Sequence, residues 1–124
     1  MPTWTARWIA PVEDEDGPDR RRPVHQLAGA ARIDHDVAAA VLHVTAHGIY
    51  EAFVNGIRVG DQELTPGWTA YRSRLQYQSY DVTGLLRRGD NVLGALLSDG
   101  WWRGQSGLAR RVDDYGPTTA LLAQ

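Results

Sequence analysis

The stretch VLHVTAHGIYEAFVNGIRVGD, residues 41–61, decides the fold. Its apolar side chains recur at every second position, which places them on one face of an extended chain; they are Leu42, Val44, Ala46, Tyr50, Ala52 and Val54. Gly48 interrupts the run and indicates a bulge or a bend. An Asn-Gly pair between apolar runs is a strong hairpin signal, because a type I′ turn needs positive φ at both central residues. The stretch therefore predicts a strand over 41–54, a turn at Asn55-Gly56 and a return strand from Ile57 to Val59.

Further short strands lie on either side of this stretch. Residues 91–98 are apolar at nearly every position, which predicts a central strand buried on both faces. Residues 75–82 and 118–123 also indicate strands, and residues 32–36 can hold a short one. The segment TGLLRRG, residues 83–89, predicts one helical turn with Thr83 or Asp81 as its cap and Gly89 as its left-handed exit. Short strands, many turn signals and almost no helix predict an all-β fold, an antiparallel β-sandwich or jelly roll.

The two ends of the chain have a different character. Residues 1–12 carry Trp4, Trp8 and Ile9, which predicts an extended N-terminal segment whose rings pack on the domain. Residues 13–24 form a charged loop, acidic first and then with three arginines; a solvated loop is favoured there over a binding role for the arginines. The last strand stops at Gln124 without a turn signal, so we expect a piece of a larger domain. Such a truncated sandwich exposes an edge or a core face, which predicts self-association or modest stability.

Composition limits the classes of protein to which the chain can belong. With 124 residues, 43% of them hydrophobic, residues 1–124 are predicted to form a single globular domain. The net charge of −2 argues against nucleic-acid binding, which favours a basic face. The absence of cysteine excludes a disulfide, a thiol nucleophile and a thiolate metal site. Neither a signal peptide nor a membrane-spanning segment is predicted, so we expect a soluble fragment of unknown localisation.

Catalytic and metal-binding patterns find little support. His43 and His47 have the spacing of a helical metal pair, but on a strand they stand roughly 13 Å apart, too far for one ion. The three residues of Asp34-His35-Asp36 point apart on an extended chain and favour a strand-end turn. No serine lies in a nucleophile elbow, and no glycine-rich loop has the context of a phosphate site. Spacing in the sequence identifies no pair of carboxylates for glycoside chemistry among the candidates Asp61, Glu63 and Asp99. The residues alone therefore identify no catalytic constellation.

Tryptophan is the unusual feature of the composition, with five Trp and five Tyr against one Phe. The run DGWWRGQSG, residues 99–107, places two tryptophans side by side, and in an extended chain these would point to opposite faces. Proteins bind sugars by stacking an aromatic plane on the apolar face and directing charged groups at the hydroxyls. The candidate carbohydrate-binding residues are Trp68, Tyr71, Asp99, Trp101, Trp102 and Arg103. The alternative is an Asp99–Arg103 pair that fixes a loop while the tryptophans pack inward, and the residues alone leave both open.

Several ordered motifs resemble the N-terminal region of bacterial α-L-rhamnosidases of glycoside hydrolase family 78. The resemblance runs from about residue 39 to residue 104 and is carried by YEAFVNG (50–56), LTPGWT (64–69), YDVT (80–83) and DGWWRG (99–104). The opening WTARWIAP and the closing YGPTTALLAQ are also similar to that family. The stretch from Glu13 to Asp36 matches the family poorly, and it reads VHQLAGAARI, residues 24–33, where such proteins usually show an apolar strand.

The resemblance implies a galactose-binding-like jelly roll that continues past Gln124 and precedes a separate (α/α)₆ barrel with the catalytic carboxylates. It implies a non-catalytic accessory domain, with the barrel and an L-rhamnose-containing glycan as partners. Some family members hold terminal L-rhamnose on this domain together with calcium, and Asn55 and Asp99 are the matched positions with suitable oxygens. Calcium takes six to eight oxygen ligands, so two residues alone are a weak basis for a site. The alternative is a structural domain that braces the barrel and binds nothing.

Overall fold

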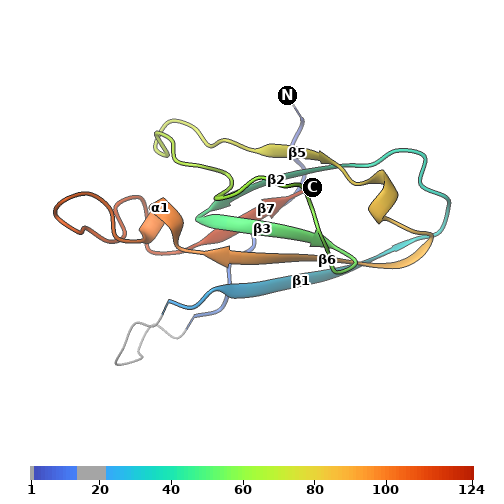
Figure 1. The fold of residues 1–124 in the computed structure, drawn as a ribbon, viewed down its shortest axis with the longest axis horizontal. Coiled ribbons are helices and arrows are strands. Elements are labelled where there is room, and N and C mark those ends of the chain that lie inside the picture. The colour runs from blue at the N-terminus through green and yellow to red at the C-terminus, as the bar shows by residue number, and fades with distance from the viewer. Residues whose placement is uncertain (1, 14–21) are drawn as a thin grey trace.

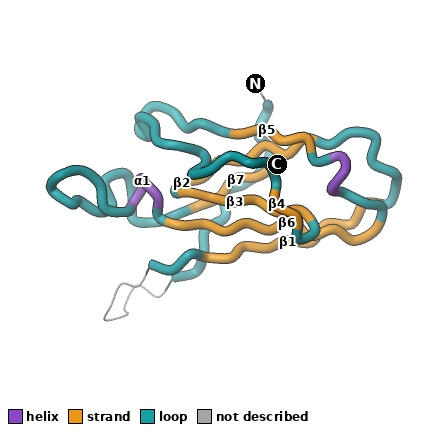
Figure 2. The backbone as a smooth tube through the Cα atoms, viewed as in Figure 1, coloured by secondary structure: helices purple, strands orange, loops and turns teal. Residues whose placement is uncertain are grey.

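A computed structural model describes residues 2–13 and 22–124 and shows two antiparallel sheets packed face to face (Figures 1 and 2). The strands are β1 (His25–Ile33), β2 (Val41–His47), β3 (Ile49–Val54), β4 (Ile57–Arg58), β5 (Gln78–Asp81), β6 (Gly89–Ser98) and β7 (Ala120–Ala123). Two short helical turns are η1 (Thr83–Leu85) and α1 (Gly100–Arg103). One sheet has the order β1-β6-β3-β4 and the other β5-β2-β7. The predicted all-β sandwich is confirmed.

Gly48 is the corner at which the chain passes from one sheet to the other. The sequence predicts one strand over 41–54, but β2 ends at His47 and β3 begins at Ile49 in the opposite sheet. Gly48 has a φ of +135°, a conformation that L-residues with a Cβ rarely adopt. The alternating apolar residues on both sides of it are all buried, so one face stays inside across both sheets. The predicted bend is therefore a crossover between the sheets rather than a bulge within one strand.

The Asn55-Gly56 hairpin is confirmed. Both residues have positive φ, 52° and 82°, and Val54 pairs with Ile57 across the turn. The hairpin lies at the same end of the sandwich as η1, and α1 lies at the opposite end (Figure 1).

The burial of β6 differs from the prediction. The strand is central, between β1 and β3, as predicted. Its inward residues Asn91, Ala95 and Leu97 are buried, but Val92 and Leu96 on the other face are 48% and 36% exposed. The prediction of burial on both faces is wrong for this chain, because the outward side of β6 remains in contact with solvent.

Three further elements have bounds that differ from the predicted ones. β1 begins at His25 and ends at Ile33, earlier than the predicted strand at 32–36, since its alanines and glycine give no alternating pattern. β5 covers only Gln78–Asp81 of the predicted 75–82. The turn at η1 is a 3₁₀ helix, in which the Asp81 carboxylate accepts the Thr83 N–H at 3.0 Å, and Gly89 has a φ of 99°. Hydrogen bonding by the Thr83 side chain first, and by its backbone N–H second, lowers the pKa of Asp81.

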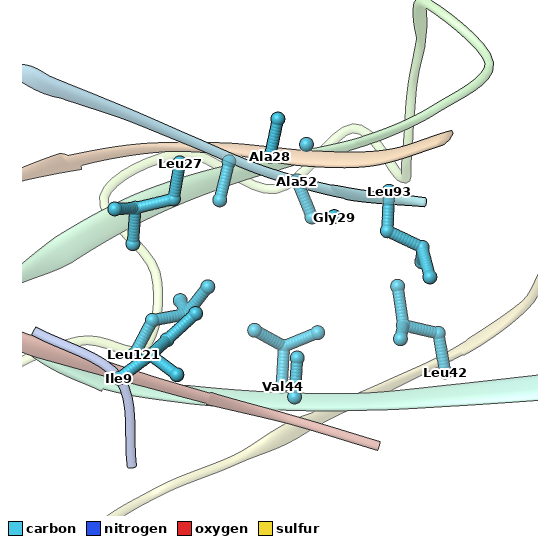
Figure 3. Close-up of a pocket in the computed structure, with 12 residues that line it drawn as sticks. Ile9, Leu27, Ala28, Gly29, Leu42, Val44, Ala52, Leu93 and Leu121 are labelled. Carbon is cyan, nitrogen blue, oxygen red and sulfur yellow. The ribbon is translucent and has the colours of Figure 1, made fainter. Parts of the chain in front are cut away.

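An open cleft of about 160 Å³ separates the sheets on the side of β1 (Figure 3). Leu27, Gly29, Ala52 and Leu93 line one wall, and Ile9, Leu42, Val44 and Leu121 line the other. The wall of the four-stranded sheet carries small residues, which leave the space unfilled. Gly29 is exposed although it pairs with Leu93 on the inward face. The domain therefore has an exposed core face here, and self-association through it stays a prediction.

Candidate binding surface around the Trp101-Trp102 turn

The two adjacent tryptophans lie on a helical turn and not on an extended strand. α1 covers Gly100–Arg103, and Gly100 has a φ of 51°. A Cβ on Gly100 would approach the Ile49 side chain to 2.5 Å, so this close contact with β3 favours glycine. Successive residues of a helix point about 100° apart. The opposite orientation that Trp101 and Trp102 would have in an extended chain therefore does not apply, because the backbone is helical here.

Trp102 belongs to an aromatic cluster. Its ring stacks on His47 with centroids 3.8 Å apart and an interplanar angle of 1°, and His47 also stacks with Trp8 at 4.3 Å. Tyr71 meets Trp102 edge-on at 5.4 Å. The indole N–H donates to the Thr118 carbonyl at 3.0 Å. Burial lowers the pKa of His47, which keeps the stacked imidazole neutral at pH 7. A ring so engaged is not free to stack on a sugar.

Arg103, the last residue of α1, is a buried cation with three sets of acceptors. Its side chain is 2% exposed. The Nε–H donates to Asp99 at 2.5 Å, and the two terminal nitrogens donate to the two oxygens of Glu13, each at 2.5 Å. Nη1 also donates to the Pro117 carbonyl at 2.8 Å. These bonds, those to Glu13 first, raise the pKa of Arg103. This arrangement agrees with the alternative stated in the sequence analysis, in which an Asp99–Arg103 pair fixes the loop.

A second arginine extends this ion network. Arg22 donates to both oxygens of Asp113, at 2.7 and 2.9 Å, and to the Arg103 carbonyl at 2.8 Å. His25 lies 2.6 Å from Glu13. Glu13, Arg22 and His25 are thus anchors of the Arg103 turn, which corrects the prediction of a solvated loop for Glu13 and Arg22. Arg20 and Arg21 lie outside the described residues. No local pattern could reveal the anchors, since Glu13 and Arg103 are 90 residues apart.

Acid should weaken this network through Glu13. The hydrogen bond from Arg103 is the largest cause that lowers the pKa of Glu13 from 4.5 to about 2. Protonation therefore favours the unfolded chain, and the stability that the carboxylate supplies is complete above about pH 4.5 and lost as the pH falls towards 2. We expect Glu13→Gln to cost about 2 kcal/mol at pH 7. Urea unfolding of both proteins from about pH 7 to about pH 2 should show this difference shrinking with acid. A difference independent of pH would contradict the role of the ionised carboxylate.

The remaining aromatic candidates differ in their exposure. Tyr71 is buried, its hydroxyl donates to the Gly67 carbonyl at 3.1 Å, and its ring contacts Trp102 and Tyr115. Trp68 is 65% exposed and Trp101 is partly exposed. Within residues 2–13 and 22–124, no ring contact is found for either of these two. The structure thus joins Tyr71 to Trp102 and Asp99 to Arg103, leaves Trp68 exposed, and half-buries Trp101 and Trp102 alike.

The two residues considered for calcium do not meet. Asn55 follows Val54, which pairs with Leu93, whereas Asp99 follows Ser98 at the other end of β6, roughly 20 Å away. The Asn55 amide is already used: it donates to the Leu85 carbonyl and the Asn91 side chain and accepts the Val92 N–H, each at 2.9 Å. These residues do not fit a calcium ion. The Asn55 amide oxygen already accepts a hydrogen bond from Val92, and the Asp99 carboxylate lies far from Asn55.

Other metal-binding patterns are also unsupported where the chain is described. His43 is bound to Ser79 at 2.7 Å through Nδ1, and His47 lies in the aromatic stack. Among residues 2–13 and 22–124, no group of three or more His, Cys, Asp or Glu side chains could hold a metal ion. The same residues contain no helix that is long and apolar enough to cross a membrane.

The order of the strands and the anchored DGWWRG turn can be compared with known proteins. The family described as "Alpha-L-rhamnosidase N-terminal domain" matches residues 35–124. The chain belongs to this family. An α-L-rhamnosidase from Streptomyces avermitilis is 48% identical over 101 residues, which are 81% of this chain and 10% of that protein. One from an Alteromonas species is 31% identical over 123 residues, 95% of this chain and 13% of that protein.

Solved rhamnosidase structures share the fold of this domain. The native α-L-rhamnosidase from Aspergillus terreus matches with a TM-score of 0.88 and 37% identity, over 96% of this chain and 14% of that one. The Streptomyces avermitilis α-L-rhamnosidase in complex with L-rhamnose matches with a TM-score of 0.77 and 49% identity, over 80% of this chain and 10% of that one. The resemblance inferred from the sequence motifs is confirmed. The rhamnosidase N-terminal domain described here spans only about a tenth of the length of these relatives.

Proposed function

We propose that the chain is a non-catalytic accessory domain of a longer α-L-rhamnosidase, whose separate barrel hydrolyses terminal α-L-rhamnose. The ion pairing of the carboxyl groups beside Arg103 is the observation that supports this proposal. Hydrolysis of a glycoside needs two carboxyl groups, one of them a general acid with a raised pKa. Glu13 and Asp99 both bind Arg103, and the pKa of Glu13 is lowered to about 2. A carboxyl group held ionised in this way is the opposite of a general acid.

A direct assay tests the absence of catalysis. The purified 124-residue chain should not hydrolyse an aryl α-L-rhamnoside, whereas an intact rhamnosidase assayed in parallel should do so. Turnover that co-purifies with the chain and is lost in Glu13→Gln or in Asp99→Asn would overturn the proposal.

We also propose that carbohydrate contact, where the domain makes it, involves Trp68 and Trp101. A sugar needs an indole face open to solvent, and Trp68 is 65% exposed in its loop. Trp102, Tyr71, Asp99 and Arg103 have internal partners and would position the turn rather than contact the ligand. The solved complex of the Streptomyces avermitilis enzyme shows that this relative binds L-rhamnose, which makes that sugar the probe to use.

A titration of the ¹⁵N-labelled chain with L-rhamnose measures this contact. Shifts should cluster on the indole signals of Trp68 and Trp101. Trp68→Ala should weaken binding at least about tenfold, the loss of roughly 1.4 kcal/mol of stacking and burial. Trp8→Ala is the matched control, since Trp8 is also exposed, at 41%, but stacks on His47. The titration should give the same result with calcium and with EDTA, because Asn55 and Asp99 do not form a site.

The second candidate function is a purely structural one. It is favoured by the number of candidate residues that the fold uses internally, above all Arg103 with its carboxylates. In that case no signal should shift at millimolar sugar, and Trp68→Ala should leave both fold and stability unchanged. The domain would then brace the catalytic barrel without a ligand of its own.

A further inference from the structure

We infer that the outward face of the β1-β6-β3-β4 sheet docks this domain against another domain of the same rhamnosidase polypeptide; the inference rests on the proposed accessory role. The docking face is defined by Ala28, Ala30, Phe53, Val92, Gly94 and Leu96. Val92 and Leu96 are 48% and 36% exposed, and the two alanines are exposed as well. A central strand with an apolar sequence on both faces is typical of a sheet covered on both sides.

The strand register makes these residues neighbours. Gly94 pairs with Ala28 on β1 and with Phe53 on β3. Val92 pairs with Ala30, and Leu96 lies two positions from Gly94 on the same face. Three adjacent strands thus form one apolar surface. The small residues Ala28 and Gly94 lie beside the larger Val92, Leu96 and Phe53 on this surface.

Polar residues surround this apolar centre. Leu96 has Gln26 and Glu51 as its cross-strand partners, and Phe53 has Arg58. At the far end Arg32 lies 3.2 Å from Asp90. Glu51 lies 3.5 Å from Arg58, so these charges are paired within the domain and need no partner charge. An apolar centre with a polar rim is the anatomy of a protein interface.

The length of the relatives supports a neighbouring domain as the partner that covers the docking face. The domain makes up 10% to 14% of the rhamnosidases that it matches, so most of each polypeptide lies outside it. A domain tethered in the same chain is present at high effective concentration and can cover a face of modest area that would not hold a separate protein. The face therefore fits a neighbouring domain of the same polypeptide, and a second copy of the chain is the competing occupant.

A chimera tests the inference. The segment of the Streptomyces avermitilis enzyme that matches this chain at 48% identity is replaced by this chain, and the melting temperature is measured. Leu96→Lys places a charge on the docking face, opposite Glu51. Val41→Lys is the matched control, since Val41 is 55% exposed on the other sheet and pairs with Asp81. We expect Leu96→Lys to lower the melting temperature of the chimera by at least about 5 °C and Val41→Lys to leave it unchanged.

The isolated chain separates docking from folding. Leu96→Lys should leave its stability within about 0.5 kcal/mol, because that position is on the surface. If the chimera does not fold, superposition on the Aspergillus terreus structure decides the matter: the six equivalent positions must be covered by parts of that chain outside the matched region. A harmless Leu96→Lys in the chimera, an uncovered face there, or a dimer of the isolated chain that Leu96→Lys dissociates would overturn the inference. None of these readouts depends on sugar binding or turnover, so the proposed function can fail independently.

Discussion

Arg103→Met should lower the free energy of unfolding of the domain by about 3–5 kcal/mol, the usual cost of removing one partner from a buried ion pair. The guanidinium is 2% exposed and donates to Glu13, Asp99 and the Pro117 carbonyl. Methionine fills a similar volume but removes the Arg103 donors from two carboxylates and a carbonyl, and only His25 at Glu13 and the more distant Arg22 at Asp99 remain. Both carboxylates are only a fifth to a quarter exposed, so water can replace the lost bonds only in part. The loss is large against the 5–15 kcal/mol of a typical domain.

Urea unfolding at pH 7 measures this prediction, with two companion variants. Arg103→Lys keeps the charge but not the planar fork, so it should recover part of the loss and no more. Arg88→Met removes an exposed arginine and should change stability by less than about 0.5 kcal/mol. The Arg103→Met variant should also lose the depressed pKa of Glu13, so its stability should fall less steeply between about pH 4.5 and pH 2. A loss below about 1 kcal/mol would mean that the network contributes little to the fold.

The parts of the fold that the sequence predicts well are those with local causes. Asn55 and Gly56 adopt the positive φ angles that asparagine and glycine tolerate best, whatever surrounds them. The alternation in residues 41–54 correctly identifies the buried face. It cannot show that the chain changes sheet at Gly48, because a glycine in a strand is found both at corners between sheets and at bulges or bends within one strand. β1 is missed for the opposite reason, since its alanines and glycine carry no pattern that marks an inner face.

In the candidate site, too, the sequence predicts the features with local causes and misses those that depend on distant residues. The helical spacing of Asp99 and Arg103 is four residues, and the sequence does place these two together as one of two alternatives. The partners that decide between the alternatives come from distant parts of the chain: Glu13 for Arg103 and His47 for Trp102. The exposure of the tryptophans is not visible in the sequence either: Trp68 is exposed, whereas Trp101 and Trp102 are both half-buried. The pair Asn55 and Asp99 rests on the family resemblance and on suitable oxygen atoms, and the antiparallel course of β3 and β6 separates them, since each residue follows the end of its strand.

Gly48→Ala should destabilise the domain by about 3 kcal/mol or more, because two separate costs add. Gly48 has a φ of +135°, which is strained for any residue with a Cβ. An added Cβ would also fall on the carbonyl oxygen of Ser98, a backbone atom that cannot rotate away. Ser98 pairs with Ile49 and immediately precedes Asp99, so relief requires the strands β3 and β6 to part next to α1. The variant should therefore disturb the Trp101-Trp102 turn as well as the corner between the sheets.

Gly84→Ala is the matched control for this change. Gly84 lies in η1, its φ is not positive, and no heavy atom lies within 4 Å of the position that an added Cβ would take, so alanine should be neutral or stabilise by about 0.5 kcal/mol. Urea unfolding gives the two free energies, and ¹⁵N spectra report on residues 98–103 through their amide shifts. A Gly48→Ala protein as stable as the native domain, with unshifted signals there, would show that the β2–β3 corner can open without cost. Loss of stability without any change at residues 98–103 would show instead that the strain at Gly48 is relieved on the β2 side, away from Ser98.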